Sequence, residues 1–500
     1  MSSKHNTNPG NPSLAERAGS AVLWRGFGLG AEKIIFLLRL LVLARLVAPA
    51  EFGLVAIGMT ATAFMARITD FGLVPALVQN PSGKKSHLDT AWTISVLRGC
   101  GITIVLFIAA PYIAALFDEP GATNIIRALV LATLVNAAAS IEIARITRDL
   151  QFRALTVIRL SSVLVNTAVS IYLATSLGAW ALVWGTVAGA AAFAVASYVV
   201  APYRPAFRLS GAGRDRVLRF GRWIFLIGVL GVMGDALLRW MVSTRLGVAE
   251  LGLLFMAVRL AFLPAQLITD LLDQVAFPVY ASLQHDRPKL ARVFRSMLTS
   301  LLVLLLPAAL IFIVVIPGLV EHVLGAQWNG ISVLMQVLVF ASVIGILGDA
   351  AIPLLKGVGT PSKVAGLDAI RLTILVIAAW GLLDTYGLLG VGVAEIIATI
   401  VSQLTVAYVL LWAIDRPFSG LLPILSTVTG SALIGALVAS ALIAVLPGPA
   451  GLVISVFAGG LASVTIGVVL DRALGLGLLR RLSEPFPRIT SLANRFMRST

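Results

Sequence analysis

The residues best able to do chemistry in this sequence are charged side chains inside long apolar segments. Arg25, Glu32 and Arg39 are spaced by seven residues, so they line one face of a helix with about 20° of drift per step. Guanidinium groups bind phosphates and carboxylates in a bidentate manner, so this stripe could form the wall of a cavity that receives a charged ligand. A set of structural ion pairs between helices is the alternative that the sequence leaves open.

Other charges in apolar segments are paired along the chain or stand alone. Arg67 and Asp70 are three residues apart, and Asp235 and Arg239 are four apart, the spacings that bring side chains together on a helix. Arg259 has no acidic residue within one helical turn. Because an uncompensated cation is costly inside a membrane, Arg259 is the strongest single candidate for contact with an anion.

These residues divide into two candidate sets. The first set would form a cationic, substrate-binding cavity: Arg25, Arg39, Arg67, Arg239 and Arg259. Buried carboxylates can hold a proton at neutral pH, so the second set would bind a coupling ion, H⁺ or Na⁺, or would pair with cations: Glu32, Asp70, Asp235, Asp349 and Glu395.

Residue patterns for enzyme chemistry are missing from the sequence. It has no GxxxxGK[ST] phosphate loop, and its four histidines show neither HExxH nor Cys/His zinc spacing. Cys100 is the single cysteine, so no intramolecular disulfide can form. We therefore expect no catalytic residues, no metal site and no cofactor.

The elements that must position the charges are transmembrane helices. The 500 residues are 59% hydrophobic and 12% charged, with a mean hydropathy of +0.97, whereas a soluble domain carries about 25% charged residues. Because a spanning helix needs about 20 apolar residues, we expect an all-α polytopic membrane protein of about 14 helices. The predicted ranges are 18–46, 53–78, 90–116, 122–144, 157–176, 179–201, 221–244, 251–278, 296–318, 331–354, 365–383, 388–413, 421–446 and 451–470.

Basic residues predict the orientation. They crowd alternate connections, and the opposite connections hold only Arg45, Arg127 and Arg245. The positive-inside rule then places both termini in the cytoplasm. The net charge of +15 is therefore mostly a topology signal, with contact to anionic lipids expected and nucleic acid not.

The spans divide into two predicted six-helix lobes and an extra pair. We expect a cytoplasmic tail at 1–17, a lobe at 18–201, a basic linker at 202–220, a lobe at 221–413, an uncharged helix pair at 414–470 and a basic tail at 471–500. The uncharged pair suits helix packing or a groove for a lipid tail.

A short echo links the two lobes. The segment RLVAPAEFGL at 45–54 is matched by RLGVAELGL at 245–253, and Ile-Thr-Asp follows each, at 68–70 and 268–270. The two copies are six helices apart, and an even number of spans preserves orientation. The echo therefore predicts a parallel repeat about an axis along the membrane normal.

These segments also carry a resemblance. The chain resembles bacterial polysaccharide flippases of the multidrug/oligosaccharidyl-lipid/polysaccharide exporter superfamily, through segments 46–54, 68–73, 76–79, 87–92 and 277–280. The resemblance implies two lobes around a central cavity that opens alternately to either side of the bacterial inner membrane. It also implies an undecaprenyl-pyrophosphate-linked oligosaccharide as cargo, bound by the cationic set, with a polysaccharide polymerase and chain-length machinery as pathway partners.

The physical reasoning from the residues agrees with this cargo. A sugar–pyrophosphate head group loses its hydration in hydrocarbon, and arginines in a cavity would replace that water. An ion-coupled multidrug or small-solute exporter of the same superfamily is the alternative, with a membrane glycosyltransferase or oligosaccharide ligase as a more remote one.

Overall fold

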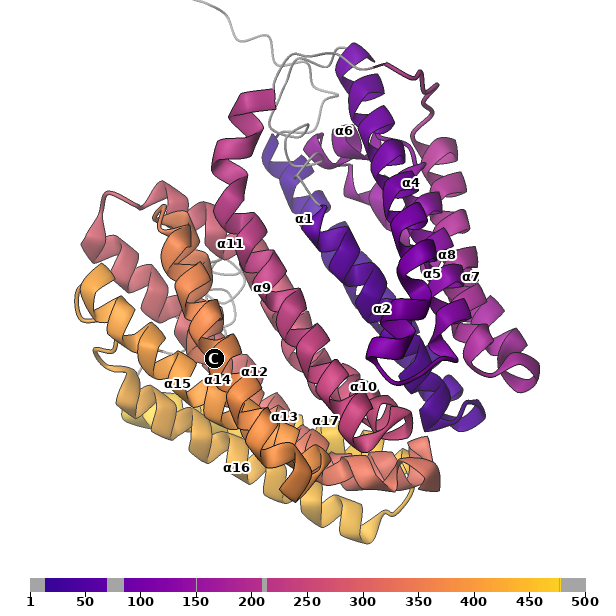
Figure 1. Ribbon diagram of the computed structural model, residues 1–500. Helices are drawn as coiled ribbons and strands as arrows, with labels where there is room; N and C mark the ends of the chain where they lie inside the picture. Colours follow the sequence, from indigo (N-terminus) through magenta and orange to yellow (C-terminus); the bar gives the residue numbers. More distant parts are fainter. Residues whose placement is uncertain (1–13, 70–84, 150, 209–213, 476, 478–500) are drawn as a thin grey trace, which may run out of the picture. The chain divides into compact units, whose positions relative to one another are not determined.

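The computed structural model describes residues 14–69, 85–149, 151–208, 214–475 and 477, and the regular elements in these ranges are all helical (Figure 1). The first helices are α1 (Leu14–Leu46), α2 (Pro49–Ile68), α4 (Lys85–Leu116), α5 (Ala122–Ala137), α6 (Ile143–Arg148), α7 (Phe152–Leu177) and α8 (Ala179–Val200). The later ones are α9 (Arg214–Leu246), α10 (Val248–Ala261), α11 (Leu263–Ser282), α12 (Arg287–Gly318), η1 (Leu319–Leu324), η2 (Ala326–Ile331), α13 (Ser332–Gly357), α14 (Pro361–Tyr386), α15 (Leu388–Ala413), α16 (Leu421–Val445) and α17 (Pro449–Leu474).

The helices have the length and composition of membrane spans. Within the described ranges, 11 helices are long and apolar enough to cross a bilayer, and α5 is a shorter apolar helix. The charged helix α1 and the pair α10–α11 occupy the other predicted spans, so the expectation of about 14 helices in a multi-pass membrane protein is confirmed. Large apolar side chains such as Tyr172, Leu422 and Phe457 are exposed on the helices, as lipid-facing surfaces require.

Two predicted helices are broken, and these predictions were wrong in detail. The segment 122–144 divides into α5 and α6 because Ser140 leaves the helix: its N–H donates to Ser197 Oγ and its hydroxyl donates to the Ala201 carbonyl. The segment 251–278 divides at Phe262 into α10 and α11. Pro264 has no N–H to continue the helical hydrogen bonding there.

The chain forms two compact units. The first contains α1, Ala61–Ala114 and Pro120–Gly221, and the second contains Val47–Thr60, Ala115–Glu119 and the chain from Arg222. The second unit thus includes two short segments that precede the predicted C-terminal lobe in the sequence. One of them is the first part of α2.

Each unit has its own packing order. In the first unit α7 packs against both α1 and α8, and α5 packs against α8. In the second unit α12 packs against α13, while α15 packs against α13 and α14. Glycines at positive φ, Gly178 (51°) and Gly387 (55°), make the tight turns of the α7–α8 and α14–α15 hairpins.

The pair α16–α17, which carries charge only at Asp471 and Arg472 in the last turn of α17, packs against α12. Leu306 of α12 contacts Ile424 and Val428 of α16, and Ile311 joins the cluster of Ala439 and Leu452. Between α16 and α17 the approach is close and reciprocal: a Cβ added at Gly435 would lie 2.6 Å from the Gly459 carbonyl oxygen, and one added at Gly459 would lie 2.7 Å from that of Gly435. These contacts favour the packing interpretation of the pair over a lipid-tail groove.

The segment 87–92 anchors the chain that follows α8. Tyr203 donates a hydrogen bond of 2.5 Å to Asp89, which is buried near the start of α4. Trp92 donates to the Ala138 carbonyl and lies edge-on to Phe207 at 5.1 Å. Burial and the neighbouring Asp89 raise the pKa of Tyr203 far above its ordinary value. This segment therefore has a structural task within the first unit.

Candidate functional site

The second unit contains a polar group on three helices, which we call the Arg239 cluster: Thr60, Asp235, Arg239 and Arg259. Arg239 on α9 lies 3.5 Å from the carboxylate of Asp235, one turn earlier. It also donates a 2.8 Å hydrogen bond to the hydroxyl of Thr60 on α2. The i,i+4 pairing predicted for Asp235 and Arg239 is confirmed.

Thr60 is built to accept this bond. Its hydroxyl donates 2.7 Å to the Ala56 carbonyl in the same helix, so the oxygen lone pairs remain for Arg239. The Arg239 side chain is 17% exposed, whereas that of Asp235 is 70% exposed. Arg239 is thus a largely buried guanidinium group held from two sides.

Arg259 on α10 completes the cluster. It is exposed, and its guanidinium carbon lies 5.2 Å from the centre of the Phe255 ring, within the range of a cation–π contact. Its charge is repelled by Arg239 and attracted by Asp235. Two cations and one carboxylate leave a net charge of one positive unit, and a bound anion would neutralise it.

Two residues of the stripe on α1, Glu32 and Arg39, contact α7 in the first unit. Glu32 lies 3.9 Å from Arg159, and Arg39 donates a hydrogen bond to the side-chain oxygen of Asn166. Asn166 also accepts a 3.1 Å hydrogen bond from Ser170. The structure therefore favours the ion-pair interpretation for Glu32 and supports a packing role for Arg39, whose substrate contact remains a prediction.

The structure gives little information about three of the predicted site residues. The side chain of Arg25 and all of Asp70 lie outside the described residues. Arg67 is exposed in the last turn of α2. The predicted pair of Arg67 with Asp70 therefore stays a prediction.

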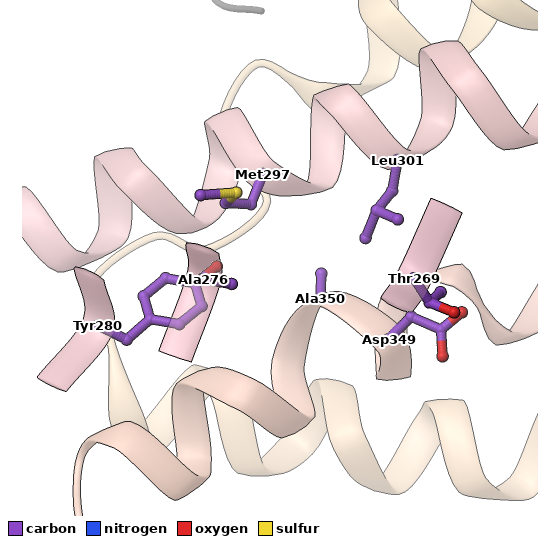
Figure 2. A pocket seen from close by; sticks show the side chains of 7 residues that line it. All are labelled: Thr269, Ala276, Tyr280, Met297, Leu301, Asp349 and Ala350. Atoms are coloured by element: carbon purple, nitrogen blue, oxygen red, sulfur yellow. The ribbon is translucent and has the colours of Figure 1, made fainter. Parts of the chain in front are cut away.

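The predicted acids Glu395 and Asp349 have different surroundings. Glu395 on α15 is 9% exposed and pairs with Arg371 of α14. Asp349 of α13 lines a small pocket together with Thr269 and Tyr280 of α11. Figure 2 shows Thr269 and Asp349 at one end of this pocket and Tyr280 at the other. Glu395 thus has an internal cation, whereas Asp349 lines a small cavity.

Several partners were not anticipated from the sequence. Arg371, the partner of Glu395, lies well inside α14. Thr60 and Asn166 are neutral, so a search for charges does not find them. The proximity of Arg159 to Glu32 depends on the packing of α1 against α7, which local spacing does not reveal. In the described part of the chain, no three His, Cys, Asp or Glu residues gather to hold a metal.

Comparison with known proteins identifies the family. Residues 42–333 match the family model described as polysaccharide biosynthesis protein. The chain is 24% identical to the lipopolysaccharide biosynthesis protein WzxC of Escherichia coli (strain K12) over 348 residues. This match covers 68% of this chain and 70% of WzxC. It is 26% identical over 329 residues to the succinoglycan biosynthesis transport protein ExoT of Rhizobium meliloti (strain 1021), covering 64% and 65% respectively.

Solved structures show the same fold. The inward closed conformation of the lipid II flippase MurJ superposes with a TM-score of 0.71 at 15% identity, covering 91% of this chain and 99% of that one. An inward-facing MATE-family multidrug resistance transporter of the MOP superfamily gives 0.57 at 16% identity, with 76% and 93% covered. The predicted resemblance is confirmed, and the chain belongs to the polysaccharide biosynthesis protein family of membrane proteins.

Proposed function

We propose that this protein is a flippase for a lipid-linked oligosaccharide. Its cargo would be an undecaprenyl-pyrophosphate-linked saccharide, moved from the cytoplasmic to the periplasmic leaflet of the bacterial inner membrane for exopolysaccharide or lipopolysaccharide synthesis. The names of WzxC and ExoT, which refer to polysaccharide biosynthesis and transport, support this class of cargo. The flipped product would pass to a polysaccharide polymerase and chain-length machinery.

The observation that carries the proposal is the net positive Arg239 cluster on membrane-spanning helices. A pyrophosphate head group carries negative charge and loses its hydration in hydrocarbon. Arg239, held by Thr60 and Asp235, is a fixed donor, and Arg259 supplies the charge in excess. Together they would replace part of the lost hydration while the lipid tail stays in the bilayer.

Transport by alternating access follows from the same requirement. A head group bound in the middle of the membrane must be reached from one side and released to the other. We propose that the head group enters from the cytoplasmic side, where the distribution of basic residues also predicts both termini. Reporter fusions at each terminus test this orientation: both should report a cytoplasmic location.

Coupling to H⁺ or Na⁺ is part of the proposal, with Asp349 as the candidate acid because it lines a pocket inside the second unit. Replacing Asp349 with Asn should abolish the dependence of transport on an imposed ion gradient. An unchanged gradient dependence would exclude Asp349.

Deletion of the gene tests the function in cells. The cells should lose a surface polysaccharide and accumulate its lipid-linked precursor in the inner leaflet. Unchanged polysaccharide without precursor accumulation would contradict the proposal. Drug sensitivity of the deletion strain with normal polysaccharide would instead support the exporter alternative.

A further inference from the structure

The two echo segments of the sequence contact each other in the structure. Segment Pro49–Leu54 begins α2 and segment Val248–Leu253 begins α10. Both belong to the second compact unit. In the aligned echo, Pro49 corresponds to Val248 and Gly53 corresponds to Gly252.

The contact is reciprocal, and we call it the glycine interlock. A Cβ added at Gly53 would overlap the carbonyl oxygen of Val248, and a Cβ added at Gly252 would overlap the carbonyl oxygen of Pro49. Because the partners occupy matching positions of the echo, the same contact is made twice with the roles exchanged. Glycine allows the backbones of the two helices to approach each other this closely.

A buried aromatic group surrounds the interlock. Phe52 is fully buried, and its ring lies 5.4 Å from that of Trp328 in a T-shaped contact and 6.3 Å from that of Phe255. Leu251 and Trp328 are also fully buried. Gly53 and Gly252 are buried as well, whereas Pro49 and Val248, whose carbonyl groups they approach, are half-buried.

Connecting segments at this end add polar contacts. The backbone N–H of Val248 donates to the carboxylate of Glu119, which follows α4. The side chain of Gln327 in η2 donates to the Val47 carbonyl at 3.5 Å. The connections before α2, after α4, before α10 and in η2 therefore meet here, and by the distribution of basic residues this is the periplasmic end.

We propose that the glycine interlock is a releasable seal that closes the periplasmic end of the transport path and separates when the path opens outward. The inference rests on the proposed transport function and adds the place where its outer closure is made. Residues of α2 up to Thr60 pack with the second unit, whereas those from Ala61 belong to the first. Release of the interlock frees the start of α2 from α10.

The chemistry of the contact suits a seal that must open. The interlock is made by backbone atoms and short van der Waals contacts, each of which contributes little alone. Its strength depends on close fit, so one added methyl group is enough to force the helices apart. The matching positions in the two repeats also explain why the echo carries glycine in both copies.

Thiol labelling tests the seal. In a Cys100→Ala background, Val55→Cys places one reporter thiol at a fully buried position of the same segment of α2. A membrane-impermeant maleimide is added from the periplasmic side, and the labelling rate is measured on the full-length protein in membranes. Gly53→Ala and Gly252→Ala should each raise the rate by about 5-fold to about 100-fold, the range expected from overpacking a close contact.

Gly435→Ala is the matched control. It adds a methyl group to a similar reciprocal glycine contact, between α16 and α17, so it perturbs packing without touching the interlock. Its labelling rate should stay at that of the parent. Equal rates in the parent and in correctly inserted Gly53→Ala and Gly252→Ala proteins would overturn the proposal, as would an equal rise in Gly435→Ala.

A second variant covers the case in which the glycine variants fail to insert. Phe52→Leu shortens the ring that contacts Trp328 and adds no atom to the interlock, so it should also raise labelling of Val55→Cys. An unchanged rate would again count against the seal. Labelling needs no lipid-linked saccharide, so the two hypotheses can fail separately. A failed transport assay together with the expected labelling result would contradict the proposed function but would still support the seal.

Discussion

Replacement of Arg259 with Gln tests the anion site most selectively. The change removes one of the two positive charges of the Arg239 cluster and keeps an apolar stem that can lie against Phe255. Arg239 retains its contacts with Thr60 and Asp235, so the local fold should be preserved. The variant thus isolates the contribution of one charge to binding an anion.

The magnitude follows from Coulomb's law. A guanidinium group about 4 Å from a phosphate contributes about 4 kcal/mol at an effective dielectric constant of about 20, and about 1 kcal/mol in bulk water. Because Arg259 is exposed, water screens its charge, and its contribution lies in the lower part of this range, at about 1–2 kcal/mol. This corresponds to an increase in Kd of about 5-fold to about 30-fold.

The assay is equilibrium binding of undecaprenyl pyrophosphate to purified protein in nanodiscs at fixed ionic strength. Arg127→Gln is the matched control, because Arg127 also lies over a phenylalanine, with its guanidinium carbon 4.8 Å from the Phe107 ring centre. The control should change Kd by less than about threefold, because Arg127 is not part of the Arg239 cluster and surface charges are screened by salt. Equal Kd values for Arg259→Gln and Arg127→Gln would refute the assignment of the cluster as an anion site.

Three further predictions concern other charges. Asp235→Asn raises the net charge of the Arg239 cluster by one unit, so the Kd for undecaprenyl pyrophosphate should fall. Because the Asp235 carboxylate is exposed, the decrease should be about 3-fold to about 10-fold. An unchanged or higher Kd would contradict the electrostatic account. Glu395→Gln leaves Arg371 without its carboxylate partner. Because the Arg371 side chain is 40% exposed, the loss of stability should be about 1–3 kcal/mol, less than the cost of breaking a fully buried pair. A thermal unfolding scan measures this loss, and an unchanged Tm would mean that the pair is not formed. Burial and the neighbouring Asp118 raise the pKa of Glu119 above its ordinary value of 4.5, so the folded protein binds this proton more tightly than the unfolded chain does. The bound proton therefore stabilises the fold fully below pH 4.5, and this stabilisation is lost as the pH rises through the raised pKa. Glu119→Gln should remove this part of the pH dependence of Tm, and an identical Tm profile would contradict the raised pKa.

The number and type of the helices could be predicted because apolar length alone decides them. A span of about 20 apolar residues has few alternatives in lipid. The breaks were harder: Ser140 ends a helix through bonds to Ser197 and Ala201, more than fifty residues away in sequence. Pro264 was a local signal for the break before α11 that length and hydropathy concealed.

The candidate site was predictable to the extent that its contacts are local. Asp235 and Arg239 are one turn apart, so their pairing follows from helix geometry. The roles of Thr60 and Asn166 depend on which helices pack together, and a neutral side chain gives no signal of that in one sequence. The echo indicated two related halves, but the contact of Gly53 with Val248 could be seen only in three dimensions.

Transport by purified protein tests the central claim most directly. Proteoliposomes containing an undecaprenyl-pyrophosphate-linked oligosaccharide in both leaflets are exposed to an impermeant glycosidase, and the protected inner-leaflet pool is followed over time. We predict that the native protein makes this pool accessible and that the Arg239→Gln, Arg259→Gln double variant does not. A pool that stays protected with the native protein, or that is lost equally with the double variant, would contradict the account.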